Sequence, residues 1–446
     1  MTSGLLWHSL PGTHDVSAAF VALYGDAPYA LWWDDQGERG RGVSYLASGS
    51  PVMVEGPHWR DALRASHSKL PSLDAAALGP LPLGLVLVLP YELGADTLGL
   101  TLPADGRPSA PIALMVDRVV AIDHRSASAT LYALGERWEG ELVQWRDATA
   151  HCLATAPTLP DPELPQAPQI LWRDSTERYR EIISEAKKAI TEGEAYQLCV
   201  TTQLHVEADI NPIALHRVIR QSNPTHHQGV IRAGELSLVS ASPETFLDVS
   251  SGGVVTTRPI KGTRPRGVTP EDDQRLADEL RGSDKEQAEN LMIVDLMRND
   301  LSVVCDTGSV AVPELMVVES YASVHQLVST VTGQLRNDAD LVDLIDSSFP
   351  AGSMTGAPKR RAVELLAGWE RAPRGYYSGV WGVWRADGSA TLAMTIRTAV
   401  ITAGSMTLGV GGGITALSEA GSEIAEVGIK AMPFLRALGH EQVEYS

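Results

Sequence analysis

One lysine stands among three arginines in the segment Arg258-Pro-Ile-Lys-Gly-Thr-Arg-Pro-Arg266. A partly buried lysine crowded by cations has a lowered pKa, so the Lys261 amine could act as a nucleophile. Gly262 beside it would let backbone amides approach an anion. The alternative is a solvated basic turn, which the spacing alone favours because charged side chains are usually exposed.

Two pairs of glutamates have the spacing of one helix face. Glu286 and Glu289 are three residues apart in a predicted helix, and Glu423 and Glu426 repeat this spacing near the C-terminal end. Carboxylates that project together suit a hard cation such as Mg²⁺. Each pair alone is more typical of an exposed acidic helix face. Together they predict a metal site only if the fold unites them.

Two further charged residues could serve acid–base chemistry or anion binding. Glu244 in Ser242-Pro-Glu244 follows a proline-fixed turn and could act as a general acid, although such a residue is more often a loop glutamate. Arg397 in Ala393-Met-Thr-Ile-Arg-Thr398 is predicted to lie in a strand. There its planar guanidinium could hold a carboxylate on the face opposite the apolar side chains, or lie at the surface.

The elements that would position these residues follow a proline-rich connector. Five prolines fall between Pro157 and Pro168, a density that blocks both helix and central strand. We therefore expect an N-terminal strand-rich domain over residues 1–155, a connector over 156–170 and a second, larger domain over 171–446.

Beyond the connector, helical and strand-like runs alternate irregularly. Asp174 or Ser175 can cap a helix that ends near Gly193. Further helices are predicted over 272–280, 284–297 and 359–366, and strands over 196–204, 391–401 and 406–410. This irregular order favours an α+β fold with large antiparallel sheets over a doubly wound parallel sheet.

Composition excludes several classes of protein. The 36 Lys and Arg against 55 Asp and Glu give a formal charge of −19, too acidic for a general nucleic-acid binder. The three cysteines lie far apart and form no C-x-x-C pair, which fits a reducing cytoplasm. The N-terminus lacks an export signal, and the apolar stretch over 81–89 is too short to span a bilayer. We therefore expect a cytoplasmic protein without a membrane or nucleic-acid partner.

The blocks described above, in this order, resemble the chorismate-utilising enzymes, and most closely the branch that forms aminodeoxychorismate for 4-aminobenzoate and folate synthesis. The resemblance covers nearly the whole chain, with shared segments at residues 30–34, 116–124, 242–246, 259–263, 288–300, 349–359, 396–398 and 411–414. Position 261 is Lys, as in this branch, where anthranilate synthases usually have Ala. Position 197 is Gln, as in members that use ammonia, where isochorismate and salicylate synthases have a lysine that activates water.

The resemblance implies that residues 171–446 form a chorismate-binding catalytic domain, and it also implies a fold and a set of site residues. The fold has two large antiparallel sheets packed face to face and surrounded by helices, with the substrate pocket between the sheets. Mg²⁺ would be held mainly by Glu289 and Glu426, with Glu286 and Glu423 beside them. The residues implied to bind the substrate are Gln197, Gly262, Thr263, Tyr377, Arg397 and Gly413.

The implied reaction is the amination of chorismate. The Lys261 amine attacks ring carbon 2 while Glu244 protonates the departing 4-hydroxyl, and ammonia then attacks carbon 4 and expels Lys261. No glutaminase signature surrounds the cysteines, so ammonia would come from a separate glutamine amidotransferase subunit. The alternatives are an anthranilate or 2-amino-2-deoxyisochorismate synthase, and a catalytically inactive scaffold that only binds an amidotransferase.

Two features bear on ligands other than chorismate. The histidine usual before Leu-Val-Ser is Gln326, with His325 one place earlier. Asp34 stands where tryptophan-inhibited anthranilate synthases have a serine that would face the inhibitor. A carboxylate there would repel the carboxylate of tryptophan, so we expect weak tryptophan inhibition or none.

Overall fold

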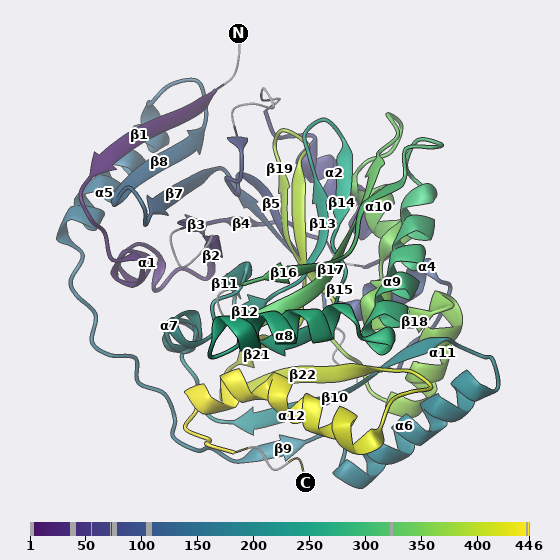
Figure 1. Ribbon diagram of the computed structural model, residues 1–446. Coiled ribbons are helices and arrows are strands. Elements are labelled where there is room, and N and C mark those ends of the chain that lie inside the picture. The colour runs from purple at the N-terminus through teal and green to yellow at the C-terminus, as the bar shows by residue number, and fades with distance from the viewer. Residues whose placement is uncertain are drawn as a thin grey trace.

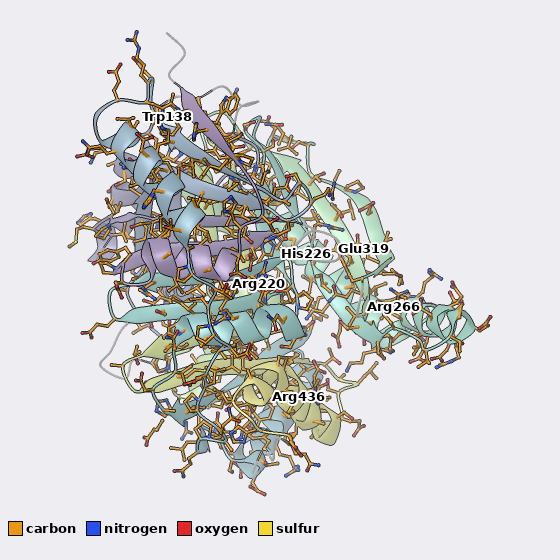
Figure 2. The ribbon with its side chains drawn as sticks, turned by 90° about the vertical axis from the view of Figure 1, so that its left-hand side faces the viewer. Trp138, Arg220, His226, Arg266, Glu319 and Arg436 are labelled. Carbon is orange, nitrogen blue, oxygen red and sulfur yellow. The ribbon has the colours of Figure 1, made fainter. Side chains whose placement is uncertain are left out.

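The computed structural model describes residues 4–35, 42–54, 56–71, 73, 78–103, 109–321, 324–442 and 445. Within these ranges, two large antiparallel sheets pack face to face and helices surround them (Figure 1). The α+β fold class predicted from the sequence is confirmed. Figure 2 shows the molecule from the side, where the segment that carries Arg266 projects away from the body.

The twelve-stranded sheet contains strands from both sides of the proline-rich connector. Its order is β1 (Leu5–Pro11), β8 (Ser128–Leu134), β7 (Arg118–Asp123), β3 (Val43–Ser48), β2 (Tyr29–Asp35), β11 (His227–Ala233), β12 (Leu236–Ser242), β21 (Thr398–Thr402), β22 (Ser405–Ile414), β10 (Gln197–Glu207) and β18 (Gly356–Ala357), with β9 (Ile170–Trp172) beside β10. The two halves meet where β2 pairs with β11, with Leu31 opposite Ile231.

The ten-stranded sheet also draws on both halves of the chain. Its order is β15 (Ile260–Pro265), β17 (Val324–Gln334), β14 (Val254–Thr257), β13 (Thr245–Val249), β20 (Ala390–Met394), β19 (Val380–Arg385), β5 (Gly84–Leu89), β6 (Ile112–Val116) and β4 (Ser50–Pro51), with β16 (Ala311–Ser320) beside β17. Residues 156–169 form neither helix nor strand. The expected connector therefore interrupts the secondary structure, whereas both sheets continue across it.

The apolar run of β5 follows from burial on both faces. Leu85 and Leu87 pack in a core with α2, α9 and α10, whereas Val86 and Val88 pack in a second core formed between the two sheets. A strand covered on both sides reads as a continuous apolar run rather than an alternating one. This central strand thus lies between the helices and the other sheet.

Helices cover the outer faces of both sheets. Against the twelve-stranded sheet lie α1 (Val16–Tyr24), α5 (Gly140–Thr155), α6 (Thr176–Thr191), α7 (Pro212–Ser222), α11 (Lys359–Glu370) and α12 (Ala420–Ala437). Against the ten-stranded sheet lie α2 (Trp59–His67), α4 (Tyr91–Thr97), α9 (Asp284–Ser302) and α10 (Leu341–Ser348), and α8 (Pro270–Arg281) packs on β15 and β17. The predicted cap of α6 is confirmed, since the Ser175 side chain accepts from the Arg178 amide. The helices predicted at 272–280, 284–297 and 359–366 are α8, α9 and α11.

Candidate active site

Two crossings of the chain from one sheet to the other lie side by side. Glu244 lies between β12 and β13, and Arg397 lies between β20 and β21, so each stands where the chain changes sheets. The Met394 amide donates to the Glu244 carbonyl at 3.0 Å, and the Ala241 amide donates to the Arg397 carbonyl at 2.9 Å. These bonds join two segments that are distant in the sequence.

The prediction that Arg397 lies within a strand is wrong. β20 ends at Met394 and β21 begins at Thr398, and Arg397 between them has a φ of +46°. Residues other than glycine seldom adopt this conformation, and it is found disproportionately at functional sites. The direction of the guanidinium is therefore set by the backbone turn between the two sheets, and not by the alternation of side chains along a strand. Burial lowers the pKa of Arg397, and the nearby Glu426 carboxylate opposes this effect.

Lys261 is aimed by an irregularity at the start of β15. The pairing of β15 with β17 shifts between Ile260 and Thr263, and Gly262 within the shift has a φ of +83°. Such a bulge changes the direction of the side chains next to it. A Cβ atom at position 262 would also lie 2.9 Å from the Glu286 Cδ atom, so a larger residue would have to displace that side chain as well as adopt an unfavourable backbone conformation.

Carboxylates lie close enough to Lys261 to be influenced by its charge. Arg258 and Arg264, which crowd it in the sequence, are each paired with a glutamate of another element. The charge of Lys261 instead acts on the carboxyl groups of Glu244 and Glu289. The two arginine side chains are therefore held by their own partners, and the crowding of Lys261 by cations stays a prediction.

Gln197, Gly413 and Lys261 meet where β10 begins and β22 ends. Gln197 is fully buried, and neither atom of its amide group has a hydrogen-bond partner. A Cβ atom at Gly413 would lie 2.6 Å from Gln197 Nε2 and 3.5 Å from Lys261 Nζ. A buried amide without partners is costly, and each such group in a native protein calls for an explanation. Binding of a polar ligand at this position would supply the missing partners.

Glu244 has the environment of a general acid. Its side chain is half-buried, and it forms a hydrogen bond with Ser353 of the 3₁₀ turn η3 (Gly352–Met354). Burial raises the pKa of Glu244, although the Ser353 bond and the charge of Lys261 oppose the rise. A carboxyl group with a raised pKa keeps its proton closer to neutral pH, where it can protonate a leaving group.

The other two residues implied to bind the substrate have different environments. Tyr377 is 5% exposed and packs against Gly409, where a Cβ atom would lie 2.0 Å from the ring Cγ. Thr263 is exposed, follows the bulge and lies opposite Gln326. The roles of Tyr377 and Thr263 in substrate binding stay predictions.

The four glutamates predicted to hold Mg²⁺ come from the first halves of α9 and α12. Lys285 of α9 brings the two pairs together, because its Nζ lies 3.4 Å from Glu423 Oε1 and 3.9 Å from Glu289 Oε1. The other two glutamates have cationic partners as well. Glu286 lies 3.6 Å from Arg264, and Glu426 lies 2.8 Å from Lys430.

The donor set fits a hard cation, although its present arrangement does not enclose one. Carboxylate oxygens are the ligands that Mg²⁺ takes in proteins. Glu289 is buried, and its Oε1 has no hydrogen-bond donor. Over the described part of the chain, no group of three His, Cys, Asp or Glu side chains is arranged to hold a metal ion. The ammonium of Lys285 lies instead between Glu289 and Glu423.

Three residues of this site have no role predicted from the sequence. Lys285 stands four residues from Glu289, and Lys430 stands four residues from Glu426. Residues at this spacing share a helix face, so the sequence could have indicated that these lysines lie beside the glutamates. Lys430 also donates to the Gly411 carbonyl at 2.7 Å, which fixes it on β22. Ser353 had no such signal, because only the tertiary fold brings η3 to Glu244.

Two residues considered for other ligands have protein partners. The Nε2 atom of His325 lies 2.9 Å from Asp273 Oδ1. Asp34 is buried on the α7 side of β2, where its carboxylate accepts from Arg220 at 2.7 Å and lies 3.2 Å from His216 Nε2. Asp34 thus has its partners within the protein, and alternation along β2 places Trp33 toward the other sheet. Weak tryptophan inhibition or none stays a prediction.

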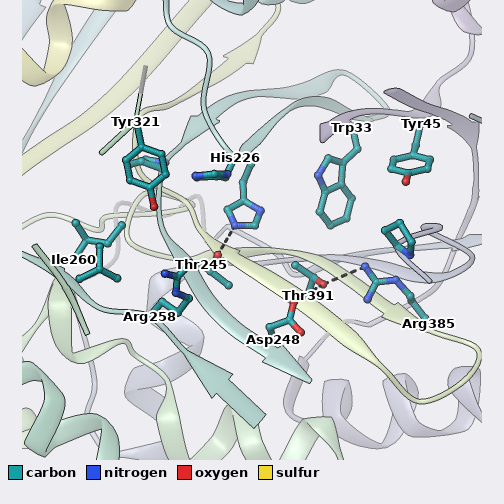
Figure 3. A pocket seen from close by; sticks show the side chains of 14 residues that line it. Trp33, Tyr45, His226, Thr245, Asp248, Arg258, Ile260, Tyr321, Arg385 and Thr391 are labelled. Carbon is teal, nitrogen blue, oxygen red and sulfur yellow. Dashed lines mark hydrogen bonds between the residues drawn. The ribbon is translucent and has the colours of Figure 1, made fainter. Parts of the chain in front are cut away.

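A cavity of about 260 Å³ lies between the two sheets, on the side of the chain opposite the Glu244 and Lys261 side chains (Figure 3). Its lining includes Thr245 and Ile260, which directly adjoin Glu244 and Lys261 in the sequence. Neighbouring positions in extended chain project to opposite sides. Neither predicted catalytic side chain lines this cavity, which is therefore distinct from the candidate active site.

Comparison with known proteins identifies the family. A profile of the chorismate binding enzymes matches residues 28–436, and the chain belongs to this family. The chain is 38% identical over 95% of its length to an aminodeoxychorismate synthase of Streptomyces pristinaespiralis, and it spans 64% of the length of that relative. It is 35% identical over 90% of its length to an anthranilate synthase component 1 of Mycolicibacterium smegmatis, and covers 80% of that protein.

A solved structure supports the fold. The chain is similar to anthranilate synthase component I from Streptococcus pneumoniae, with a TM-score of 0.73, 24% identity, and coverage of 96% of this chain and 92% of the other. Among the described residues, no helix combines the length and the apolar character needed to cross a membrane.

Proposed function

We propose that the chain aminates chorismate at carbon 4 to form 4-amino-4-deoxychorismate. The observation that carries this proposal is the meeting of the Lys261 amine with the unpartnered, buried amide of Gln197 beside Gly413. The lysine at position 261 makes the chain resemble the aminodeoxychorismate branch of the chorismate-binding enzymes. The Streptomyces relative supports the same branch.

The chain's own residues supply a nucleophile and an acid. The Lys261 amine attacks carbon 2 of the ring, the double bond shifts, and the 4-hydroxyl leaves as water after it takes a proton from Glu244. Ammonia then attacks carbon 4 and gives one proton back to the Glu244 carboxylate, the double bond shifts back, and the bond between carbon 2 and Lys261 breaks to return the lysine amine. The net change replaces one hydroxyl with one amino group, so no oxidant or reductant is needed.

The remaining residues hold the dianionic substrate. Arg397, whose guanidinium is half-buried at the sheet crossing, would bind one carboxylate in its planar fork. Glu286, Glu289, Glu423 and Glu426 would hold Mg²⁺, which would supply positive charge for the other carboxylate in an otherwise acidic protein. Gln197 would donate to the substrate or to the incoming ammonia.

The ammonia would come from a glutamine amidotransferase partner. The three cysteines are a buried Cys199, a buried Cys305 and a partly buried Cys152, and burial raises the pKa of all three thiols. A nucleophilic cysteine needs a lowered pKa, so these thiols are poorly suited to glutamine hydrolysis. We expect the purified chain to use ammonium salts at high pH, where free NH₃ is present, and not glutamine.

The second candidate is amination at carbon 2, which gives 2-amino-2-deoxyisochorismate or anthranilate. The observation in its favour is the mycobacterial relative, of which the chain covers the larger share. The presence of Lys261 argues against it, because a lysine bound to carbon 2 would block that carbon from ammonia.

Product analysis decides between the two candidates. The purified chain is incubated with chorismate, MgCl₂ and an ammonium salt, and the products are separated and identified by NMR, since the two aminodeoxy isomers have the same mass. We expect 4-amino-4-deoxychorismate, and no turnover in excess EDTA. Anthranilate or the 2-amino isomer as the main product would refute the proposal.

Variants of Lys261 test its role as nucleophile. Lys261→Ala should lose most of the 4-amino product and could open carbon 2 to ammonia or water. Lys261→Arg should lose it as well, because a guanidinium stays protonated and cannot attack carbon. Near wild-type product formation by Lys261→Arg would rule out the covalent step and leave Lys261 as a charge that binds the substrate.

A further inference from the structure

We propose that Lys285 is a built-in counter-ion that occupies the Mg²⁺ site in the metal-free protein and is displaced when the ion binds. This inference rests on the proposed function only in its assignment of the metal ligands. It concerns Lys285, a residue outside the proposed catalytic and ligand sets. Its consequence is that the affinity for Mg²⁺ is set by competition with this side chain.

The contacts of Lys285 place its charge between the two acidic pairs. Its Nζ lies 3.4 Å from Glu423 on α12 and 3.9 Å from Glu289 on its own helix. The Glu289 and Glu423 side chains are only 9% and 3% exposed. Two buried carboxylates from different helices would repel each other strongly without a cation between them. Lys285 supplies that cation.

Lys285 is also the cation of this site that can leave. Its side chain is 38% exposed, and its ammonium is held by a hydrogen bond to Glu423 and an ion pair with Glu289. Lys430, by contrast, is tied to the Gly411 carbonyl of β22. A lysine stem is long and flexible, so the ammonium of Lys285 can turn into solvent while the backbone of α9 stays in place.

The exchange replaces one positive charge with two. The four glutamates face Lys285, Lys430 and Arg264 in the described conformation, and Arg264 is shared with Glu279. The charge of Lys261 also acts on Glu289 and Glu426. When Lys285 leaves and a divalent ion enters, the four carboxylates gain one further positive charge among them. Glu289 Oε1, which has no hydrogen-bond donor, becomes available as a metal ligand.

The test measures Mg²⁺ binding in the absence of chorismate. MgCl₂ is titrated into the full chain at constant ionic strength, and the dissociation constant is read by calorimetry and from the rise in the melting temperature. Lys285→Met removes a competitor that makes two partly screened ion pairs, so Mg²⁺ should bind roughly tenfold more tightly. The metal-free variant should melt at a lower temperature than wild type and gain more from Mg²⁺.

Two control variants separate this effect from general charge and from folding. Lys188→Met removes the same charge from the exposed face of α6 and should leave the Mg²⁺ affinity unchanged. Lys285→Arg keeps the charge and should bind Mg²⁺ no more tightly than wild type. Circular dichroism verifies that each variant is folded.

Each outcome bears on the proposal. An unchanged Mg²⁺ affinity in folded Lys285→Met would overturn the counter-ion role, even if chorismate amination is found. Failure of both wild type and Lys285→Met to bind Mg²⁺ would overturn it as well. Tighter Mg²⁺ binding by the variant would support it, even if the product assays contradict the proposed reaction.

Discussion

A buried charge network between the two halves of the chain offers a measurable test of the fold. Asp34 of β2 is 1% exposed and accepts from Arg220 of α7 at 2.7 Å and from the Trp32 indole at 3.0 Å. Ser44 and His216 complete its surroundings. Although burial opposes ionisation, the bond to His216 and the charge of Arg220 hold the pKa of Asp34 well below its usual range.

The substitution Asp34→Asn should cost several kcal/mol. One carboxylate oxygen becomes an NH₂ group, which can donate a hydrogen bond but cannot accept one from Arg220. Wherever it points in this site, the NH₂ group faces a group that is itself a donor. Loss of a charge-assisted bond to a buried group costs about 1.5–3 kcal/mol, and breaking a buried pair costs about 3–5 kcal/mol. Arg220 is 23% exposed and can be hydrated, so we expect about 3 kcal/mol.

The expected change in melting temperature follows from the size of the chain. Unfolding entropy is roughly 2.1 cal/mol/K per residue, which for 446 residues makes 1 kcal/mol equal to about 1 °C. Differential scanning calorimetry should therefore show a fall of about 3 °C for Asp34→Asn. The control Asp295→Asn removes an exposed ion pair whose carboxylate is 80% exposed, and should shift the melting temperature by less than about 1 °C.

A double-mutant cycle and a pH series identify the cause. Asp34→Asn combined with Arg220→Met should cost less than the sum of the single changes, because the second change removes the charge left unpaired by the first. The folded-state pKa of Asp34 is depressed, so its contribution to stability is present above the unfolded pKa of about 3.9 and is lost as the pH falls below it. A loss below 1 °C for Asp34→Asn, or strict additivity in the cycle, would refute the reasoning.

Two further predictions concern the active site. Glu244→Gln should lower kcat by about 10²–10⁴-fold. At constant free NH₃, the rate of the wild type should fall as the pH rises through the raised pKa of Glu244, and the variant should not show this fall. If the variant keeps the same fall in rate at high pH, another group is responsible for it. Gly413→Ala should raise the KM for chorismate, because the added methyl lies 2.6 Å from the Gln197 amide, whereas Gly428→Ala on α12 meets nothing within 4 Å and should leave KM unchanged. Equal KM values for the two alanine variants would show that substrate does not approach Gly413.

The sequence by itself determined the local elements and the inventory of reactive groups. The Ser175 cap and the helical spacing after it depend on residues within a few positions of each other, so α6 could be placed without tertiary information. The same is true of α9 and its two glutamates. The motif around Lys261 and the Glu244 motif needed no structure either, because their residue types and order are characteristic of a family.

Only the tertiary structure decided how these groups face one another. Arg397 looked like a strand residue because its neighbours are apolar and β-branched, but the chain changes sheets there and turns its backbone to a φ of +46°. The two arginines beside Lys261 each turn toward a glutamate that is distant in the sequence. Side-chain direction in such places depends on long-range pairing, which local propensity does not contain.

The metal site shows most clearly which features the sequence determines and which depend on the tertiary structure. Glu286 and Glu289 share a helix face by spacing alone, as do Glu423 and Glu426. Their union depends on the packing of α9 on β17 and of α12 on β22, and on Lys285, whose charge joins the two pairs. A cation between buried carboxylates is an electrostatic requirement of the folded state. It could therefore be recognised only when both helices were in place.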